Sequence, residues 1–260
     1  MLLDVNITFA VVLAVLLAVA AGVVALARLG RARDTLVAGG RAAVQLIAVS
    51  LVIGWVMREL PLLLGFLLLM YGVAVWTAGR RVVPSPGRGW WWAGVPIAAG
   101  VVPVVGTLVL TGLVPVRGVA LIPVTGILIG GALTATVLGG RRALDELETR
   151  RGEVEAGLAL GLAEREARLE VARRAASDAL LPGLDQTRTV GLVTLPGAFV
   201  GMLLGGASPW QAGAVQLFVL VALMLVQAVA VAAVLELVAR GALARGPATD
   251  DASGRRRSRD

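Results

Sequence analysis

The sequence predicts an all-α, polytopic membrane protein with about seven transmembrane helices. Of its 260 residues, 58% are hydrophobic, a larger share than soluble domains of this length carry. The charged residues sit in blocks, and the uncharged runs between them are long enough to cross a hydrocarbon core of about 30 Å, which takes roughly 20 apolar residues. Such runs are expected to be helical, because backbone polar groups in lipid must be satisfied within the segment.

The expected spans follow the uncharged runs in order. The runs that give one span each are 5–27, 60–79, 89–116 and 118–140. Another span, about 35–57, is interrupted only near its start by Arg41. The run 189–235 is long enough for two spans, with a turn at GGASPW (205–210) between them. The first span follows Asp4 instead of a basic stretch, so we expect a retained helix and not a cleaved signal.

Arginine placement predicts the orientation. All 24 basic residues are arginines; 22 fall on one side of the expected membrane, and only Arg58 and Arg117 fall on the other. The positive-inside rule then puts the N-terminus outside and the C-terminus in the cytoplasm, which an odd number of spans also requires. We therefore expect a multi-pass protein of the inner (plasma) membrane, surrounded by lipid. The high pI marks topology, and no nucleic-acid partner is expected.

This topology divides the chain into four parts. Residues 1–140 hold spans one to five, and 141–188 form a cytoplasmic helical coupling element. Residues 189–240 hold spans six and seven, and 241–260 form a basic tail that we expect to be disordered.

The residue types that are missing exclude several kinds of chemistry. The chain has no Cys, no His and no Lys. It therefore lacks thiolate and imidazole metal ligands, a Ser-His pair, and the lysine of a G-x-x-x-x-G-K-[ST] phosphate loop. No carboxylate lies near the middle of a span, where a proton- or sodium-coupled carrier usually keeps one. We expect no enzymatic activity and no cofactor, identify no metal-ligand set, and place any ATP hydrolysis on another chain.

The element 141–188 is the one substantial polar segment. It reads as two helices with a break around Gly157–Gly161, with apolar residues along one face and the i,i+4 pairs Glu164–Arg168 and Glu170–Arg174 on the rest. One interpretation is a connector lying on the membrane surface, and the other is a docking element for a cytoplasmic partner.

A polar cluster precedes the expected sixth span. It consists of Asp185, Gln186, Thr187, Arg188 and Thr189. These residues either cap the helix start or form a joint that transmits motion into the spans. Further along, Pro196 is expected to kink the helix, with Gly197 beside it as part of a hinge. Glycines at 197, 201 and 205 give a face for close helix packing, within or between protomers.

Polar residues inside the spans are candidates for a translocation path. Arg41 and Gln45 share a face of the second span; alternatively, Arg41 is an interfacial anchor and Gln45 an interhelical hydrogen bonder. The other candidates are Thr125, Thr134, Thr136, Gln216 and Gln227.

Four stretches resemble one known family. They are GRAAVQL (40–46), IPVTGILIGGALTAT (122–136), EVEAGLALGLAEREA (153–167) and LLPGLDQTRTVGLVTLPG (180–197). Together they resemble the FetB-type iron-export ABC permeases, which are related to the plant aluminium-tolerance membrane subunit. Where such relatives usually read Gly-Met and Gly-Asn, this chain has Gly126–Ile127 and Gly130–Gly131.

The resemblance implies the membrane subunit of an ABC exporter of iron or another metal ion, driven by a separate ATP-binding subunit. Because closed two-fold symmetry is the commonest arrangement, we expect a homodimer of the permease in a four-subunit complex. The alternatives are an ABC permease for a non-metal solute and a non-transporting scaffold or regulator. The resemblance also implies a coupling segment in 153–167. The coupling residues expected there are Glu155, Ala156, Gly161, Ala163, Glu164, Glu166 and Ala167.

Overall fold

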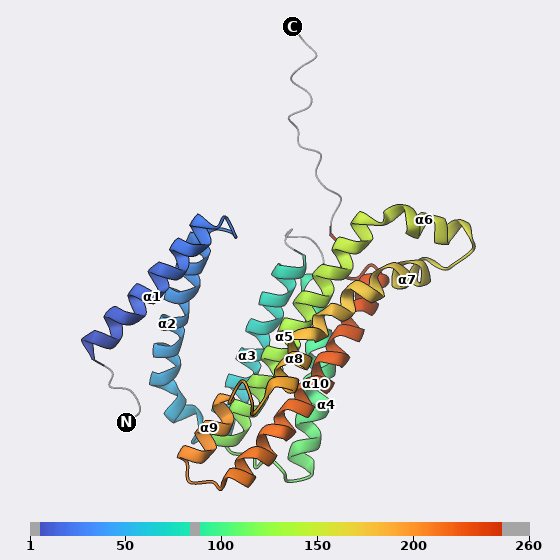
Figure 1. Cartoon of the computed structure of the whole chain (residues 1–260). Helices are drawn as coiled ribbons and strands as arrows, with labels where there is room; N and C mark the ends of the chain where they lie inside the picture. The colour runs from blue at the N-terminus through green and yellow to red at the C-terminus, as the bar shows by residue number, and fades with distance from the viewer. Residues whose placement is uncertain (1–5, 84–88, 246–260) are drawn as a thin grey trace. The chain divides into compact units, whose positions relative to one another are not determined.

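The computed structural model describes residues 6–83 and 89–245, and the chain divides into two compact units between Glu59 and Leu60. Every regular element of the described residues is a helix (Figure 1). The all-α polytopic architecture predicted from the sequence is therefore confirmed. Of the expected basic tail, residues 246–260 lie outside the described part.

The first unit contains two helices, α1 (Ile7–Leu26) and α2 (Ala32–Val56), packed against each other. Asn6 caps α1, because its side-chain oxygen accepts a hydrogen bond from the N–H of Phe9 at 3.0 Å. Gly39 leaves no room for a side chain, since Leu17 lies directly against it. The expected first and second spans correspond to these two helices.

The second unit is built around four long helices that run side by side (Figure 1). They are α3 (Leu60–Val82), α4 (Gly94–Leu110, preceded by the 3-10 turn η1, Trp90–Ala93), α5 (Gly118–Thr149) and α10 (Pro209–Ala239). Small residues let these helices approach closely: Gly100 lies against Val226, and Gly140 lies against Val82 and Val234. The buried core of the unit lies between these helices.

Within the described residues, six helices are long and apolar enough to cross a membrane: α1, α2, α3, η1 with α4, α5 and α10. The expected continuous sixth span is wrong. The chain there forms α8 (Leu181–Thr189), a non-helical link over 190–196, and α9 (Gly197–Leu204). In Figure 1, α8 lies partway along the bundle and α9 lies at the end where α10 begins. The chain thus runs along the bundle in two short helices instead of one.

Local chemistry explains the interruption. Gly191 has a φ of +83°, and its N–H donates to the carbonyl of Thr194 at 2.8 Å, which closes a tight loop. Pro196 disfavours the helical region for Leu195 before it. Pro196 itself has extended backbone and lies directly before α9. The sequence predicted a kink within a continuous helix, whereas the structure has a break between two helices.

Beyond the bundle, the chain forms a helical hairpin. α5 continues to Thr149, nine residues past the expected end of the fifth span, and is followed by α6 (Arg151–Ala159) and α7 (Glu164–Ser177). α7 returns to the bundle, where it packs on α5 and α10, and the 3-10 turn η2 (Asp178–Leu180) leads directly into α8. We call the end of the second unit where α5 and α10 finish the hairpin end.

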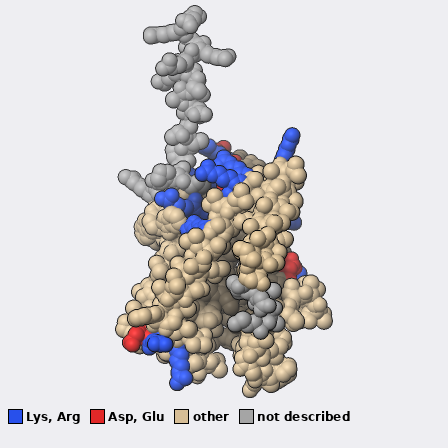
Figure 2. Space-filling view, turned by 90° about the vertical axis from the view of Figure 1, so that its left-hand side faces the viewer, with Lys and Arg blue, Asp and Glu red and all other residues tan. Residues whose placement is uncertain are grey.

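Charged side chains are scarce over much of the surface. Figure 2 shows broad stretches of surface without charged residues. The large exposed side chains of the six apolar helices are mostly aliphatic. This surface is that of a protein embedded in lipid, as the sequence predicted.

Candidate functional site: the helical hairpin and the interrupted crossing

The α6–α7 hairpin ends in an apolar tip. Its turn contains Gly161, whose φ of +92° belongs to the left-handed region, between Leu160 and Leu162. Leu160 is 86% exposed and Leu162 is 42% exposed. Exposed leucines at a protruding turn are typical of a protein–protein contact, because they gain from burial against an apolar partner.

The structure separates the predicted coupling residues into two groups. Ala156, Gly161 and Ala163 lie exposed at or near the tip. Ala167 is buried, and it packs against Gly157 across the hairpin, so its small side chain serves the hairpin itself. The expectation that Ala167 leaves room for a partner is therefore wrong.

The three predicted coupling glutamates already have partners within the hairpin. Glu155 pairs with Arg151 at 3.0 Å, and Glu164 pairs with Arg168. Glu166 accepts a hydrogen bond from the N–H of Ala163 at 3.3 Å and so caps α7. All three carboxylates remain exposed. Their pairing with basic groups of a partner stays a prediction.

Ion pairs hold α7 on the bundle. Arg165 of α7 binds Glu236 of α10 through two hydrogen bonds of 2.7 and 2.8 Å. This bidentate contact raises the pKa of the Arg165 guanidinium, because the carboxylate favours its charged form. Arg142 of α5 pairs with Asp178 at the end of α7 at 3.2 Å. The hairpin is thereby tied to both long helices at the hairpin end.

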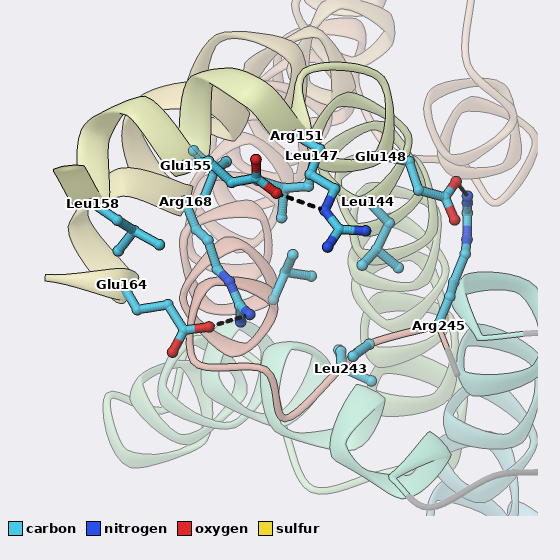
Figure 3. Close-up of a pocket in the computed structure, with 13 residues that line it drawn as sticks. Leu144, Leu147, Glu148, Arg151, Glu155, Leu158, Glu164, Arg168, Leu243 and Arg245 are labelled. Atoms are coloured by element: carbon cyan, nitrogen blue, oxygen red, sulfur yellow. Dashed lines mark hydrogen bonds and ion pairs between the residues drawn. The ribbon is translucent and has the colours of Figure 1, made fainter. Parts of the chain in front are cut away.

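A cavity of about 550 Å³ lies beneath the hairpin. Figure 3 shows its lining, which comes from α5, α6, α7, the end of α10 and the segment after α10. Leu144, Leu147, Leu158 and Leu243 give it an apolar part. Three ion pairs surround that part: Arg151–Glu155, Arg168–Glu164 and Arg245–Glu148.

The predicted polar cluster lies inside α8, not at the start of a span. Thr187 donates to the carbonyl of Gly183 at 2.9 Å, and Thr189 donates to the carbonyl of Asp185 at 2.8 Å. Asp185 and Arg188 form an exposed ion pair at 3.4 Å, and Gln186 is also exposed. The capping interpretation is therefore wrong, because these side chains bond within one helix. The role of the cluster as a joint stays a prediction.

α8 packs closely against α10 at Gly183. Gly183 is buried, and a methyl group in its place would collide with the side-chain amide oxygen of Gln227. Gln227 also lies near Gly131 of α5. We call α8, the link over 190–196 and α9 the interrupted crossing. A glycine on α8 and a polar side chain on α10 thus fix the position of the interrupted crossing against the bundle.

Several predicted path residues are buried in the second unit. Thr125, Thr136 and Gln216 are at most 5% exposed, and Thr125 Oγ1, Thr136 Oγ1 and Gln216 Oε1 have no hydrogen-bond partner among the described residues. Thr125 and Thr136 are eleven residues apart on α5, as are Gln216 and Gln227 on α10. That spacing is close to three helical turns and places each pair on one helix face. A buried polar atom without a hydrogen-bond partner is costly, so these three atoms are candidates for contact with water or a solute.

The remaining path residues are placed differently. Thr134 is exposed and donates to the carbonyl of Gly130 at 3.0 Å. Arg41 and Gln45 are exposed on α2 of the first unit. Their joining with the residues of the second unit in one path stays a prediction.

The predicted glycine face on α9 has no packing partner among the described residues. No heavy atom of another element lies within 4 Å of the position that a Cβ atom would take at Gly197 or Gly201, and Gly205 follows the helix end. Packing within the protomer is therefore not observed there, and packing between protomers stays a prediction.

The Arg165–Glu236 pair was missed by sequence reasoning. Its two residues are 71 positions apart, and no local spacing joins them. The available signal was Glu236 itself, a lone carboxylate in the last turns of a long apolar helix, which needs a basic partner.

Comparison with known proteins identifies the family. The sequence matches the family described as "Uncharacterised protein family (UPF0014)" over residues 7–243. This chain belongs to the UPF0014 family. Its relatives in that family include membrane proteins of plants and bacteria.

Three relatives illustrate the range of similarity. The chain is 40% identical over 167 residues to the Arabidopsis thaliana protein ALUMINUM SENSITIVE 3, and this alignment covers 64% of the chain but only 60% of that relative. It is 37% identical to the rice UPF0014 membrane protein STAR2, over 80% of the chain and 73% of the relative. It is 27% identical to the Escherichia coli protein named a probable iron export permease, FetB, over 74% of each.

No solved structure matches the chain. The family assignment therefore rests on sequence, and it agrees with the multi-pass helical membrane architecture. The resemblance to FetB-type and plant aluminium-tolerance membrane proteins seen in the sequence is confirmed at the level of the family.

Proposed function

We propose that this UPF0014 protein is the permease subunit of an ABC exporter in the inner membrane, with ATP hydrolysis on a separate ATP-binding subunit. The relative named as an iron export permease supports the transport role. The absence of lysine supports the division of labour, because a phosphate loop of the G-x-x-x-x-G-K-[ST] type needs one. In this proposal the hairpin end faces the cytoplasm, where most arginines of the sequence are expected.

The observation that carries the proposal is the connection between the hairpin tip and the interrupted crossing. The ATP-binding subunit docks on the tip around Leu160. Its motion reaches α10 through the Arg165–Glu236 pair and reaches α8 through η2, which follows α7 without a break. Discontinuous helices next to buried polar groups are a common arrangement at transporter binding sites.

Movement of α8 relative to α10 would change the surroundings of the buried polar groups. Gln227 lies against Gly183, so a shift of α8 alters access to the side of α10 that carries Gln216 and Gln227. We propose that these residues, with Thr125 and Thr136, line the path in a state that opens on ATP binding.

The cargo in this proposal is iron or another metal ion, following the named activity of the bacterial relative. A non-metal solute is a second candidate, because Thr125, Thr136, Gln216 and Gln227 offer neutral hydroxyl and amide groups for hydrogen bonding. Metal ions prefer charged or imidazole ligands over such groups. Metal content of cells that lack the gene distinguishes the two cargo classes: accumulation of a metal supports the first candidate, and an unchanged content supports the second.

Co-purification tests the assembly. We expect the chain to co-purify with an ABC ATP-binding subunit in a 2:2 complex with two-fold symmetry, the commonest closed arrangement. Leu160→Asp should abolish this association by placing a charge in an apolar contact, whereas Leu160→Met should retain it. A stoichiometry of 1:2 or 2:1 would contradict the symmetric homodimer, and full association of Leu160→Asp would contradict docking at the tip.

A further inference from the structure

The cavity beneath the hairpin has the size of a small-molecule site. Its volume of about 550 Å³ falls in the range of small-molecule sites, which are mostly apolar with a few directed polar groups. Its apolar part and its arginines come from α5, α6, α7, the end of α10 and the segment after α10 (Figure 3). The cavity can therefore hold a ligand only when the hairpin, the end of α5 and the segment after α10 are in place.

In two of the three ion pairs around the cavity the arginine is the less exposed partner, whereas in the third Arg151 is more exposed than Glu155. The side chains of Arg168 and Arg245 are only 30% and 28% exposed, whereas their partners Glu164 and Glu148 are 63% and 65% exposed. The guanidinium groups are thus held near the cavity while the carboxylates remain largely hydrated. A carboxylate displaced from such a pair would return to water at little cost. Asp145, which also pairs with Arg245, is similarly exposed at 56%.

We propose that this cavity binds an anionic amphiphile, with a phosphate group at Arg168, Arg245 as a second basic group on the opposite side of the cavity, and an apolar chain against Leu147 and Leu158. Guanidinium groups match the oxygens of phosphate with paired hydrogen bonds, which favours a phosphate over a simple halide or a neutral group. The apolar part of the cavity and its volume favour a ligand that carries a hydrocarbon portion, beyond phosphate alone.

The position of the cavity allows such a ligand to come from either of two sources. It lies at the ends of α5 and α10, where the apolar helices leave the expected hydrocarbon region. A phospholipid of the adjacent leaflet can reach this level, since basic pockets at membrane-helix ends bind anionic headgroups. A soluble phosphate ester offers the same chemistry from the aqueous side.

A bound anion would also act on the hairpin. Arg168 donates to the carbonyl of Ala239 at the end of α10, at 3.4 Å, and belongs to α7. A phosphate held by Arg168 would therefore act on α7 and on its contact with the end of α10. Binding at this site would therefore stabilise the hairpin in its observed position, independently of whether an ATP-binding subunit docks at the tip.

The test uses octyl phosphate as the anionic probe and octyl glucoside as the neutral control of equal chain length. The full-length protein is placed in phosphatidylcholine nanodiscs, and its unfolding temperature is measured with each compound. We expect octyl phosphate, at about tenfold excess over its dissociation constant, to raise the unfolding temperature by about 3–5 °C. Octyl glucoside should cause no such rise.

Two sets of variants assign the effect to the cavity. Arg168→Gln with Arg245→Gln should remove the rise, while Arg173→Gln, an exposed arginine of α7 outside the cavity, should keep it. Glu164→Gln should strengthen octyl phosphate binding by about two- to fivefold, because the competing carboxylate is gone. Its matched control, Glu170→Gln, should leave the affinity unchanged. The gain in Glu164→Gln does not depend on whether the double arginine variant folds.

Native mass spectrometry distinguishes the sources. Retention of phosphatidylglycerol by the native protein, and its loss in Arg168→Gln with Leu147→Trp, would identify a membrane lipid; a thermal rise with no retained lipid would identify a soluble ligand. Equal responses to octyl phosphate and octyl glucoside would overturn the proposal, and so would an unchanged affinity in Glu164→Gln.

Discussion

Arg165 of α7 and Glu236 of α10 form a bidentate ion pair, with Nε–Oε1 at 2.7 Å and Nη2–Oε2 at 2.8 Å. Glu236 also accepts from Arg240, one turn further along α10. The pair joins the protruding hairpin to a helix that runs the length of the bundle. In the proposed mechanism, displacement of the hairpin would act on α10 through this pair.

The first prediction concerns this pair. Arg165→Gln and Glu236→Gln should each lower ATP hydrolysis by the assembled complex by about two- to fivefold, a modest loss because the pair is partly exposed. The double variant should be no worse than Glu236→Gln alone, since both changes remove the same contact. Steady-state ATP hydrolysis in reconstituted vesicles provides the measurement.

Arg173→Gln serves as the control, because it removes an exposed arginine of the same helix that forms no ion pair within the described residues. Additive losses in the double variant would show that Arg165 and Glu236 act separately and would contradict the role of the pair.

The second prediction concerns the contact between α8 and α10. Gly183→Ala should destabilise the protein by about 1–3 kcal/mol, because the added methyl group collides with the amide of Gln227 in a closely packed place. Gln227→Ala should restore most of that stability in the double variant by making room for the methyl group. Thermal unfolding of the four proteins measures this coupling, and equal losses with and without Gln227 would rule out the contact.

The third prediction concerns topology. Ser208→Cys should react with a membrane-impermeant thiol reagent in intact cells, because it lies at the end of the bundle opposite the hairpin. Ala163→Cys should react only after the membrane is opened. The native chain has no cysteine, so each variant carries a single reactive thiol. Labelling of intact cells at Ala163 alone would reverse the proposed orientation.

The long helices were predictable because lipid imposes one requirement on them. An uncharged run of sufficient length must satisfy its own backbone, so runs such as 118–140 and 60–79 correspond directly to α5 and α3. Absence of charge does not guarantee a continuous helix, however. The stretch after Thr189 is uncharged but contains Gly191 and Pro196, which favour a loop and a new helix start.

The site was predictable only where its contacts are local. The hairpin, its turn at Gly161 and the Glu164–Arg168 pair follow from sequence spacing, and the structure contains all three. The contact of Gly183 with Gln227 joins residues far apart in the chain, so spacing gives no sign of it. Ala167 illustrates the opposite error, because its small size suits both a docking surface and the interior of a hairpin.

Docking of an ATP-binding subunit on the hairpin tip is the central claim, and Ala163→Trp addresses it with little change to the fold. Ala163 is exposed and precedes α7 in extended backbone, so a larger side chain is tolerated there in the isolated protein. Gly161→Trp also enlarges the tip, but any side chain at Gly161 strains its left-handed backbone. Ala163→Trp therefore separates docking from folding more cleanly.

The most direct measurement is ATP hydrolysis by the ATP-binding subunit with native or Ala163→Trp permease in vesicles, after equal membrane insertion of both has been verified. The account predicts that the native protein stimulates hydrolysis and that Ala163→Trp does not, because the indole prevents close approach at the tip. Normal association and normal stimulation by Ala163→Trp would contradict it.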